Sequence, residues 1–199
     1  MAAPTAVGNI KNVFLANPKG ISVIGGLYYG PLDAAIPDAT FAIDNRMSHS
    51  GFLSDDALDE EEQRNIAKKY AWGSDQVASP QESFGLTLGF TMLEFLNVNV
   101  AKLAYGDQNV TATAATATHG NQLSIFHTSD RLGMRSWLLD TYDQGKHVQK
   151  FYPMGEIESK KTQKFSNKEI LAHTVLATFY PDANGKYGYI RTDDGLLTV

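Results

Sequence analysis

The chain has 199 residues and a formal net charge of −5, and it contains no cysteine. This length suits one domain with a hydrophobic core, and 43% hydrophobic with 20% charged residues is ordinary for a folded protein. The acidic balance argues against tight general binding of nucleic acid, and the lack of cysteine excludes disulfides and thiol catalysis. We therefore expect a single domain over residues 1–199.

The N-terminal region carries no targeting or membrane signal. Residues 1–5 lack the positive charge followed by an apolar stretch that marks a signal peptide. No apolar run approaches the roughly 20 residues needed to cross a bilayer. We expect the protein to be made in the cytoplasm without membrane insertion, and residues 1–12, which are small and polar, to form a flexible N-terminal arm.

The first third of the chain alternates short strand signals with loops. Residues 21–29 favour a strand broken at Gly25 and Gly26, and residues 41–43 favour another short strand. Residues 44–63 are irregular and end in an acidic run, so we expect a long loop there.

Residues 64–72 fit two structures. The acidic residues before them and Lys68 and Lys69 near their end suit the dipole of a helix. The side chains nevertheless alternate from Arg64 to Trp72 with a period of two, which favours a strand.

The clearest pattern lies in residues 83–92. Large apolar side chains occupy every second position, and small or hydroxylated residues stand between them. This period places the two sets on opposite faces of one strand. The apolar set is Phe84, Leu86, Leu88, Phe90 and Met92, and the small polar set is Ser83, Gly85, Thr87, Gly89 and Thr91.

A short helix is expected directly after this strand. Asn97 can cap its N-terminus, and Val98, Val100 and Leu103 belong to an apolar stripe. Gly106 can end the helix in a left-handed turn. Nothing else in the sequence is clearly helical.

The rest of the chain favours β structure. Residues 111–118 alternate threonine and alanine and change register at Ala115 and Thr116, which indicates a bulge or an exposed strand whose partner the sequence leaves open. Hairpin turns are expected at 143–146 and 181–185. Further strands are expected at 123–127, 135–142, 147–152, 160–165, 170–180 and 187–191. With at least eight strand segments, the fold class is mainly β, a sandwich or a barrel.

The sequence carries no recognisable catalytic or metal-binding motif. Its histidines have no HxH or HExxH spacing, and the common phosphate, dinucleotide and hydrolase signatures are absent. The acidic run lacks the alternating ligands and central glycine of a calcium loop. We therefore expect no enzyme, no cofactor, no metal and no catalytic residue. The five histidines are His49, His119, His127, His147 and His173. We expect His173 to pack within a strand. Whether His119, His127 and His147 converge in space is left open.

Several short motifs in a fixed order give the chain a resemblance to a known family. Ala71-Trp72-Gly73 is followed by Asp75, the alternating strand, and a short helix closed by Gly106. In this order the chain resembles the major tail proteins (tail tube subunits) of long-tailed, siphovirus-type bacteriophages, especially those infecting actinobacteria. Ser74 departs from the family pattern, which has glycine there. The similarity covers most of the length and rests on residues 51–55, 66–75, 93–94, 105–111 and 177–182.

The resemblance implies a β-sandwich or half-barrel flanked by one short α-helix. It implies a structural virion protein that forms hexameric rings, which stack into the hollow tail tube through which DNA passes without specific binding. The expected partners are other copies of the chain, the tape measure protein during assembly, and the tail terminator and distal tail proteins. The expected location is the virion tail, after assembly in the host cytoplasm.

Two surfaces are candidate contact sites in such an assembly. We expect the face bearing Ser83, Gly85, Thr87, Gly89 and Thr91 to look toward the lumen or a neighbouring subunit. We expect the loop at 44–63 and the N-terminal arm to contact adjacent subunits or rings, because both are polar without a core of their own. The candidate inter-ring residues are Asp55, Asp56, Asp59, Glu60, Glu61 and Glu62.

Three other functions remain open. The first is another virion β protein, such as a distal tail, tail terminator or head-tail connector subunit. The second is a carbohydrate-binding β-sandwich, in which aromatic residues such as Trp72 and Trp137 would be ligand platforms instead of packing groups. The third, an enzyme, requires a pocket of converging histidines and carboxylates.

Overall fold

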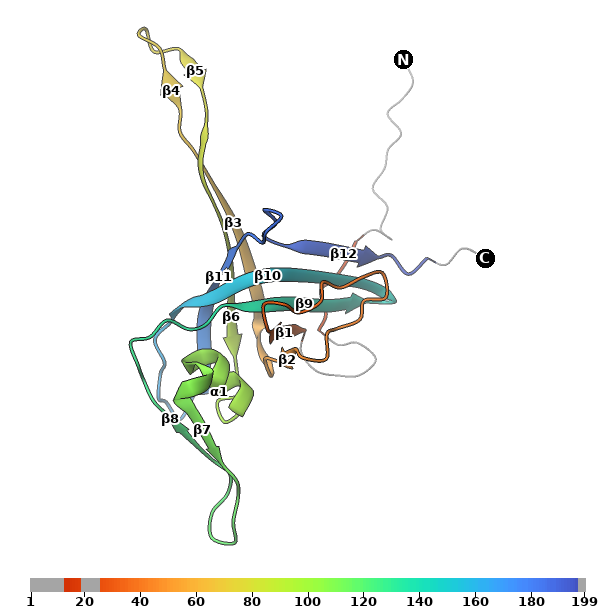
Figure 1. Ribbon diagram of the computed structural model, residues 1–199, viewed down its shortest axis with the longest axis vertical. Coiled ribbons are helices and arrows are strands. Elements are labelled where there is room, and N and C mark those ends of the chain that lie inside the picture. The colour runs from red at the N-terminus through yellow and green to blue at the C-terminus, as the bar shows by residue number, and fades with distance from the viewer. Residues whose placement is uncertain (1–12, 19–25, 197–199) are drawn as a thin grey trace.

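One curled antiparallel sheet dominates the fold (Figure 1). The computed structural model describes residues 13–18 and 26–196, so the expected N-terminal arm at 1–12 lies outside the described residues. The strands are β1 (Leu27–Gly30), β2 (Ser48–His49), β3 (Leu53–Ile66), β4 (Lys69–Tyr70), β5 (Gln76–Ala78), β6 (Gln81–Met92), β7 (Val110–Thr113), β8 (Gln122–Ile125), β9 (Arg135–Asp143), β10 (Lys146–Lys160), β11 (His173–Tyr180) and β12 (Tyr189–Asp193), and the helices are α1 (Val98–Tyr105) and the short 3-10 turn η2 (Asp107–Asn109).

The main sheet contains eight strands in the order β2-β1-β9-β10-β11-β6-β3, with β12 paired to β10. Two small two-stranded sheets, β4–β5 and β7–β8, extend from it at opposite ends of the long axis (Figure 1). The expectation of a mainly β half-barrel with one short α-helix is therefore confirmed for the described residues.

The apolar face of β6 forms the centre of the core, as its alternation predicts. Leu86, Leu88, Phe90 and Met92 are all buried, and the alternate residues of the neighbouring strand β11 are buried beside them. Large side chains on one face of adjacent strands stabilise a sheet by removing apolar surface from water.

The helix α1 covers this apolar face. The side chain of Asn97 accepts a hydrogen bond from the backbone N–H of Asn99 at 2.9 Å, which confirms the predicted N-cap. Val100 and Leu103 are buried in the core. Gly106 ends the helix with a positive φ of 92°, which favours glycine, but its ψ of 144° lies outside the left-handed turn expected from the sequence.

The strands β1, β9 and β10 are covered on both faces. Trp137 packs in the main core, whereas its neighbour Leu138 points the other way and packs with Ala34 and Phe151. The strand expected at 41–43 is wrong, because Phe41 has a φ of +57° and its carbonyl accepts a hydrogen bond from the Gln149 side chain at 2.9 Å. This segment is a loop over the second face of the sheet.

The expected long loop at 44–63 is wrong for its second half, because residues 53–66 form β3, which pairs with β6. The acidic sequence shows no apolar alternation because the outer part of this hairpin exposes both faces to water. The helical alternative for residues 64–72 is also wrong, since Ile66 ends β3 and Trp72 lies in the turn between β4 and β5.

In the C-terminal half, most expected strands are present, but some of them pair with other strands than the sequence suggested. The hairpin turn at 143–146 is confirmed, with positive φ at Gln144 and Gly145. The strand that follows runs on to Lys160, so β11 pairs with the second half of β10, and residues 161–165 are not a strand. The partner of the threonine-rich stretch is β8, which pairs with Val110–Thr113.

Candidate functional site

The small polar face of β6 lies on the side of the sheet opposite the core. The strand register continues this face across β3 and β11: Thr87 lies between Glu61 and Thr178. Thr91 and Thr174 share a hydrogen bond between their hydroxyls at 2.9 Å. All five predicted residues, Ser83, Gly85, Thr87, Gly89 and Thr91, are exposed or half-buried, so together they form one surface.

The six acidic candidates on β3 do not form one surface. The register places Asp59 and Glu61 on the polar face, whereas Glu60 and Glu62 point to the other side of the sheet. Glu60 contacts Lys150 at 3.1 Å and accepts a hydrogen bond from Tyr152. Glu62 forms an ion pair with Arg64 at 2.6 Å, and Asp55 and Asp56 lie in an irregular part of the ladder between Leu53 and Leu58.

The hairpin of β3 and β6 projects away from the body of the molecule and ends in β4 and β5 (Figure 1). Its outer part carries exposed apolar side chains: Tyr70 is 59% exposed, Val77 is 65% exposed and Trp72 is fully exposed at 105%. A fully exposed tryptophan is unusual for a monomeric surface, which makes Trp72 a candidate contact residue. The sequence favoured packing of Trp72 in the core or between subunits, and this exposure rules out the first of the two.

The sheet ends in an edge that carries no partner strand. The strand order terminates at β3, so the side of this strand away from β6 is unpaired within the described residues. A strand of 14 residues at about 3.4 Å per residue gives an edge of about 45 Å. Long free edges are sites for pairing with other chains, and the acidic side chains of β3 disfavour pairing of this edge with the same edge of a second copy.

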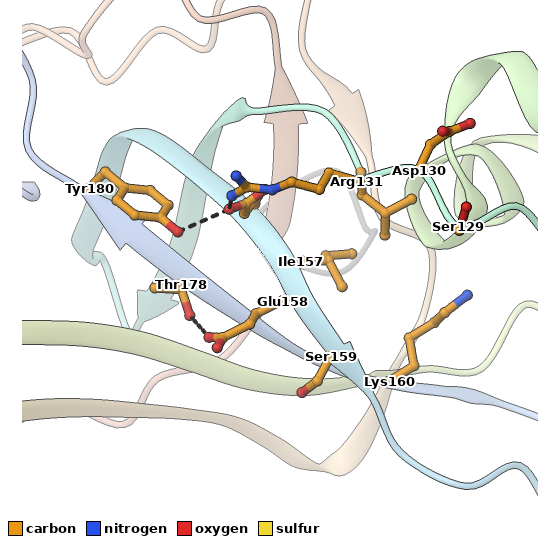
Figure 2. Close-up of a pocket in the computed structure, with 11 residues that line it drawn as sticks. Ser129, Asp130, Arg131, Ile157, Glu158, Ser159, Lys160, Thr178 and Tyr180 are labelled. Atoms are coloured by element: carbon orange, nitrogen blue, oxygen red, sulfur yellow. Dashed lines mark hydrogen bonds and ion pairs between the residues drawn. The ribbon is translucent and has the colours of Figure 1, made fainter.

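A shallow pocket of about 450 Å³ lies on the polar face beside β10 and β11 (Figure 2). Glu156 is buried at its edge and is held by two donors, the guanidinium of Arg131 and the hydroxyl of Tyr180, the latter at 2.9 Å. Figure 2 also shows Glu158 accepting a hydrogen bond from Thr178. The loop that carries Arg131 is thereby fixed to the sheet.

The contacts of Glu156 also change the proton affinity of their partners. The carboxylate of Glu156 raises the pKa of the Tyr180 hydroxyl, since loss of that proton would put two negative charges together. The hydrogen bond to Glu156 also raises the pKa of Arg131. Three carboxylates line the pocket, and two of them, Glu156 and Glu158, already accept side-chain hydrogen bonds, while the third is Asp130.

His119, His127 and His147 do not converge. His147 forms a pair with Asp140 at 2.5 Å between the stacked rings of Phe41 and Tyr142. His127 lies against Tyr105, and His119 bonds to the carbonyl of Gly120 in the β7–β8 hairpin. Within residues 13–18 and 26–196, no group of three or more histidine or carboxylate side chains is placed to hold a metal ion.

The sequence analysis missed the exposed tip of the hairpin. The signal was present in the alternation of Tyr70 and Trp72, but an apolar residue in a strand is buried by default, and only the tertiary structure shows that this strand leaves the body of the molecule. The polar face of β6, by contrast, was identified from its alternation alone.

The described part of the chain contains no helix with the length and apolar character to span a bilayer. Its α-helix has 8 residues. No protein-family model matches the sequence, and no curated protein matches it either.

Proposed function

We propose that the protein is a self-assembling structural subunit, and that its assembly is the hollow tail tube of a long-tailed bacteriophage, built from stacked hexameric rings. The observation that carries the proposal is the free edge of β3 on a projecting hairpin whose tip exposes Trp72. In a lone molecule these features are a risk of aggregation, but in a closed ring the edges of neighbouring copies pair.

The two faces of β6 support the same proposal. One face holds the core, and the other carries glycines, serine and threonines on β6 and continues across the adjacent strands β3 and β11. Such a surface presents no lysine or arginine on β6 itself, and the adjacent strand β3 adds Asp59 and Glu61. A neutral or acidic lining of this kind lets a polyanion pass without gripping it.

The motif order around Trp72 and Gly106 supports the tail tube over other assemblies of β-rich subunits. A distal tail, terminator or connector subunit remains the second candidate, since such proteins also close rings through sheet edges. They differ from a tube subunit in that their rings do not stack without limit.

Negative-stain electron microscopy of the purified chain over a range of concentrations tests the proposal. Long hollow tubes of uniform width are the expected result. Discrete rings that never elongate would favour the terminator or connector, and a chain that stays monomeric at millimolar concentration would refute self-assembly. The variant Trp72→Ser provides the matched control, because its side chain is fully exposed and contributes nothing to the core.

A further inference from the structure

A small cavity near the C-terminal end of α1 gathers positive charge without a matching carboxylate. Its volume is about 190 Å³, and its walls include Lys160, Lys161, His127, His173 and Tyr105. None of the residues that line it is acidic. Protein cavities with several cationic donors and no counter-ion are suited to a negatively charged ligand.

Lys160 is the central cation. Its Nζ donates a hydrogen bond to the carbonyl of Ala104 at 2.7 Å and lies 3.6 Å from the centre of the Tyr105 ring. Among the described residues it forms no ion pair with a carboxylate. Partial burial lowers the pKa of Lys160, as expected for a cation that lacks a counter-ion.

His173 lies in the wall of the same cavity. The side-chain amide nitrogen of Gln163 lies 2.8 Å from its Nδ1, so Nδ1 accepts and the neutral ring carries its proton on Nε2. The residue is 1% exposed, and Nε2 has no hydrogen-bond partner among the described residues. Because Nε2 is itself buried, the His173 ring senses charge in the cavity but is not one of its donors.

We propose that this cavity binds one small oxyanion, of the phosphate or carboxylate class, with Lys160 and Lys161 as its donors. The volume suits a single oxyanion with a few water molecules, since pockets for nucleotides or drug-sized ligands are several times larger. The inference is independent of the tail tube, because it uses no residue of the polar face or the hairpin.

An anion in the cavity would change the pKa values of the groups around it. Burial, and then the charge of Lys160, lower the pKa of His173 to about 4. The other ionisable groups that line the cavity are His127, Lys161 and Tyr105, none of them a carboxylate. A bound oxyanion favours the charged form of both His173 and Lys160, so it raises both pKa values.

Titration of the full chain with inorganic phosphate, followed by NMR of the histidine rings at constant ionic strength, tests the proposal. The His173 signal, identified with His173→Gln, is expected to shift saturably, and its pKa is expected to rise. A parallel titration with acetate separates the two ligand classes: a response to both indicates recognition of charge alone, and a response to phosphate only indicates a tetrahedral oxyanion.

Two lysine variants supply the control. Lys161→Met is expected to weaken binding about tenfold or more, the loss typical of a charged hydrogen bond. Lys164→Met serves as the matched variant, since Lys164 is exposed and pairs with Glu169 outside the cavity. A His173 signal that does not respond to either anion, or equal binding by Lys161→Met and the parent chain, would overturn the proposal.

Discussion

The carboxylate of Glu60 on β3 accepts a hydrogen bond from the hydroxyl of Tyr152 on β10. Two strands, β6 and β11, lie between these strands in the sheet. Three strand spacings amount to about 14 Å across a flat sheet, which is too far for a side-chain contact. The two residues meet only because the sheet curls, so this contact helps to hold the half-barrel closed.

Removal of this hydrogen bond is expected to destabilise the fold. Burial, and then the nearby Glu60, raise the pKa of Tyr152, so its hydroxyl remains a donor over the whole working pH range. Tyr152→Phe is expected to lower the free energy of unfolding by about 1–2 kcal/mol, measured by urea denaturation, because Glu60 loses a partly buried partner. Tyr70→Phe, at the exposed hairpin tip, is expected to change stability by less than about 0.5 kcal/mol. Equal effects of the two variants would contradict the role given to Tyr152.

His173 is expected to make stability depend on pH. Burial, and then Lys160, lower its pKa from 6.5 to about 4 in the folded chain, so the unfolded chain takes up the proton first as the pH falls. The stability that neutral His173 provides is thus complete above pH 6.5 and decreases toward pH 4, by up to roughly 3 kcal/mol. Urea denaturation at several pH values is expected to show a smaller decrease for His173→Gln than for His119→Gln. Parallel pH profiles for the two variants would refute the assignment.

Ser74 holds a backbone conformation that suits glycine. Its φ of +73° lies in the left-handed region, where a side chain is strained. Ser74→Gly is expected to raise the free energy of unfolding of the hairpin tip by up to about 1 kcal/mol, whereas Ser74→Ala keeps the strain and brings no gain. Amide hydrogen exchange at residues 69–78 measures this local stability. Slower exchange in the alanine variant than in the glycine variant would be inconsistent with strain at this position.

The exposed tip of the hairpin is expected to be needed for assembly and not for folding. Trp72→Ser is expected to leave the thermal midpoint of the unassembled chain unchanged and to reduce tube formation at least tenfold, because a large apolar contact is lost between copies. Phe165→Ser is the matched control: this phenylalanine is 81% exposed in a loop far along the chain from the hairpin. Sedimentation and electron microscopy measure the outcome. A normal yield of tubes from Trp72→Ser would show that the hairpin tip is not part of the contact between copies.

The polar face can be mapped with single cysteines, since the native chain has none. A Cβ added at Gly85 meets no atom within 4 Å, so Gly85→Cys is expected to fold normally and to react with a bulky maleimide in the unassembled chain. Assembly is expected to slow this reaction at least tenfold, because the face then lies in the lumen or against a neighbour. Gly120→Cys, equally open and located between β7 and β8, gives the rate for an unhindered position in the unassembled chain. An unchanged rate at Gly85→Cys after assembly would place this face on the outside.

Side-chain patterns in the sequence predicted the elements that have one apolar face and one polar face. The alternation in residues 83–92 located β6 and identified its buried face, and Asn97 located the start of α1. The acidic β3 escaped prediction because backbone pairing with β6, and not its own side chains, makes it a strand. Phe41 shows the opposite error: its aromatic side chain favours a strand, but its positive φ excludes one.

The sequence by itself determined the fold class, the central strand and the capped helix, because side-chain periodicity and capping act over a few neighbouring residues. Only the tertiary structure decided which strand edges stay open, which acidic residues turn inward, and that His173, Lys160 and Lys161 line one cavity. These features depend on contacts between residues far apart in the chain. Their geometry is set by the curl of the whole sheet, which no short stretch of sequence encodes.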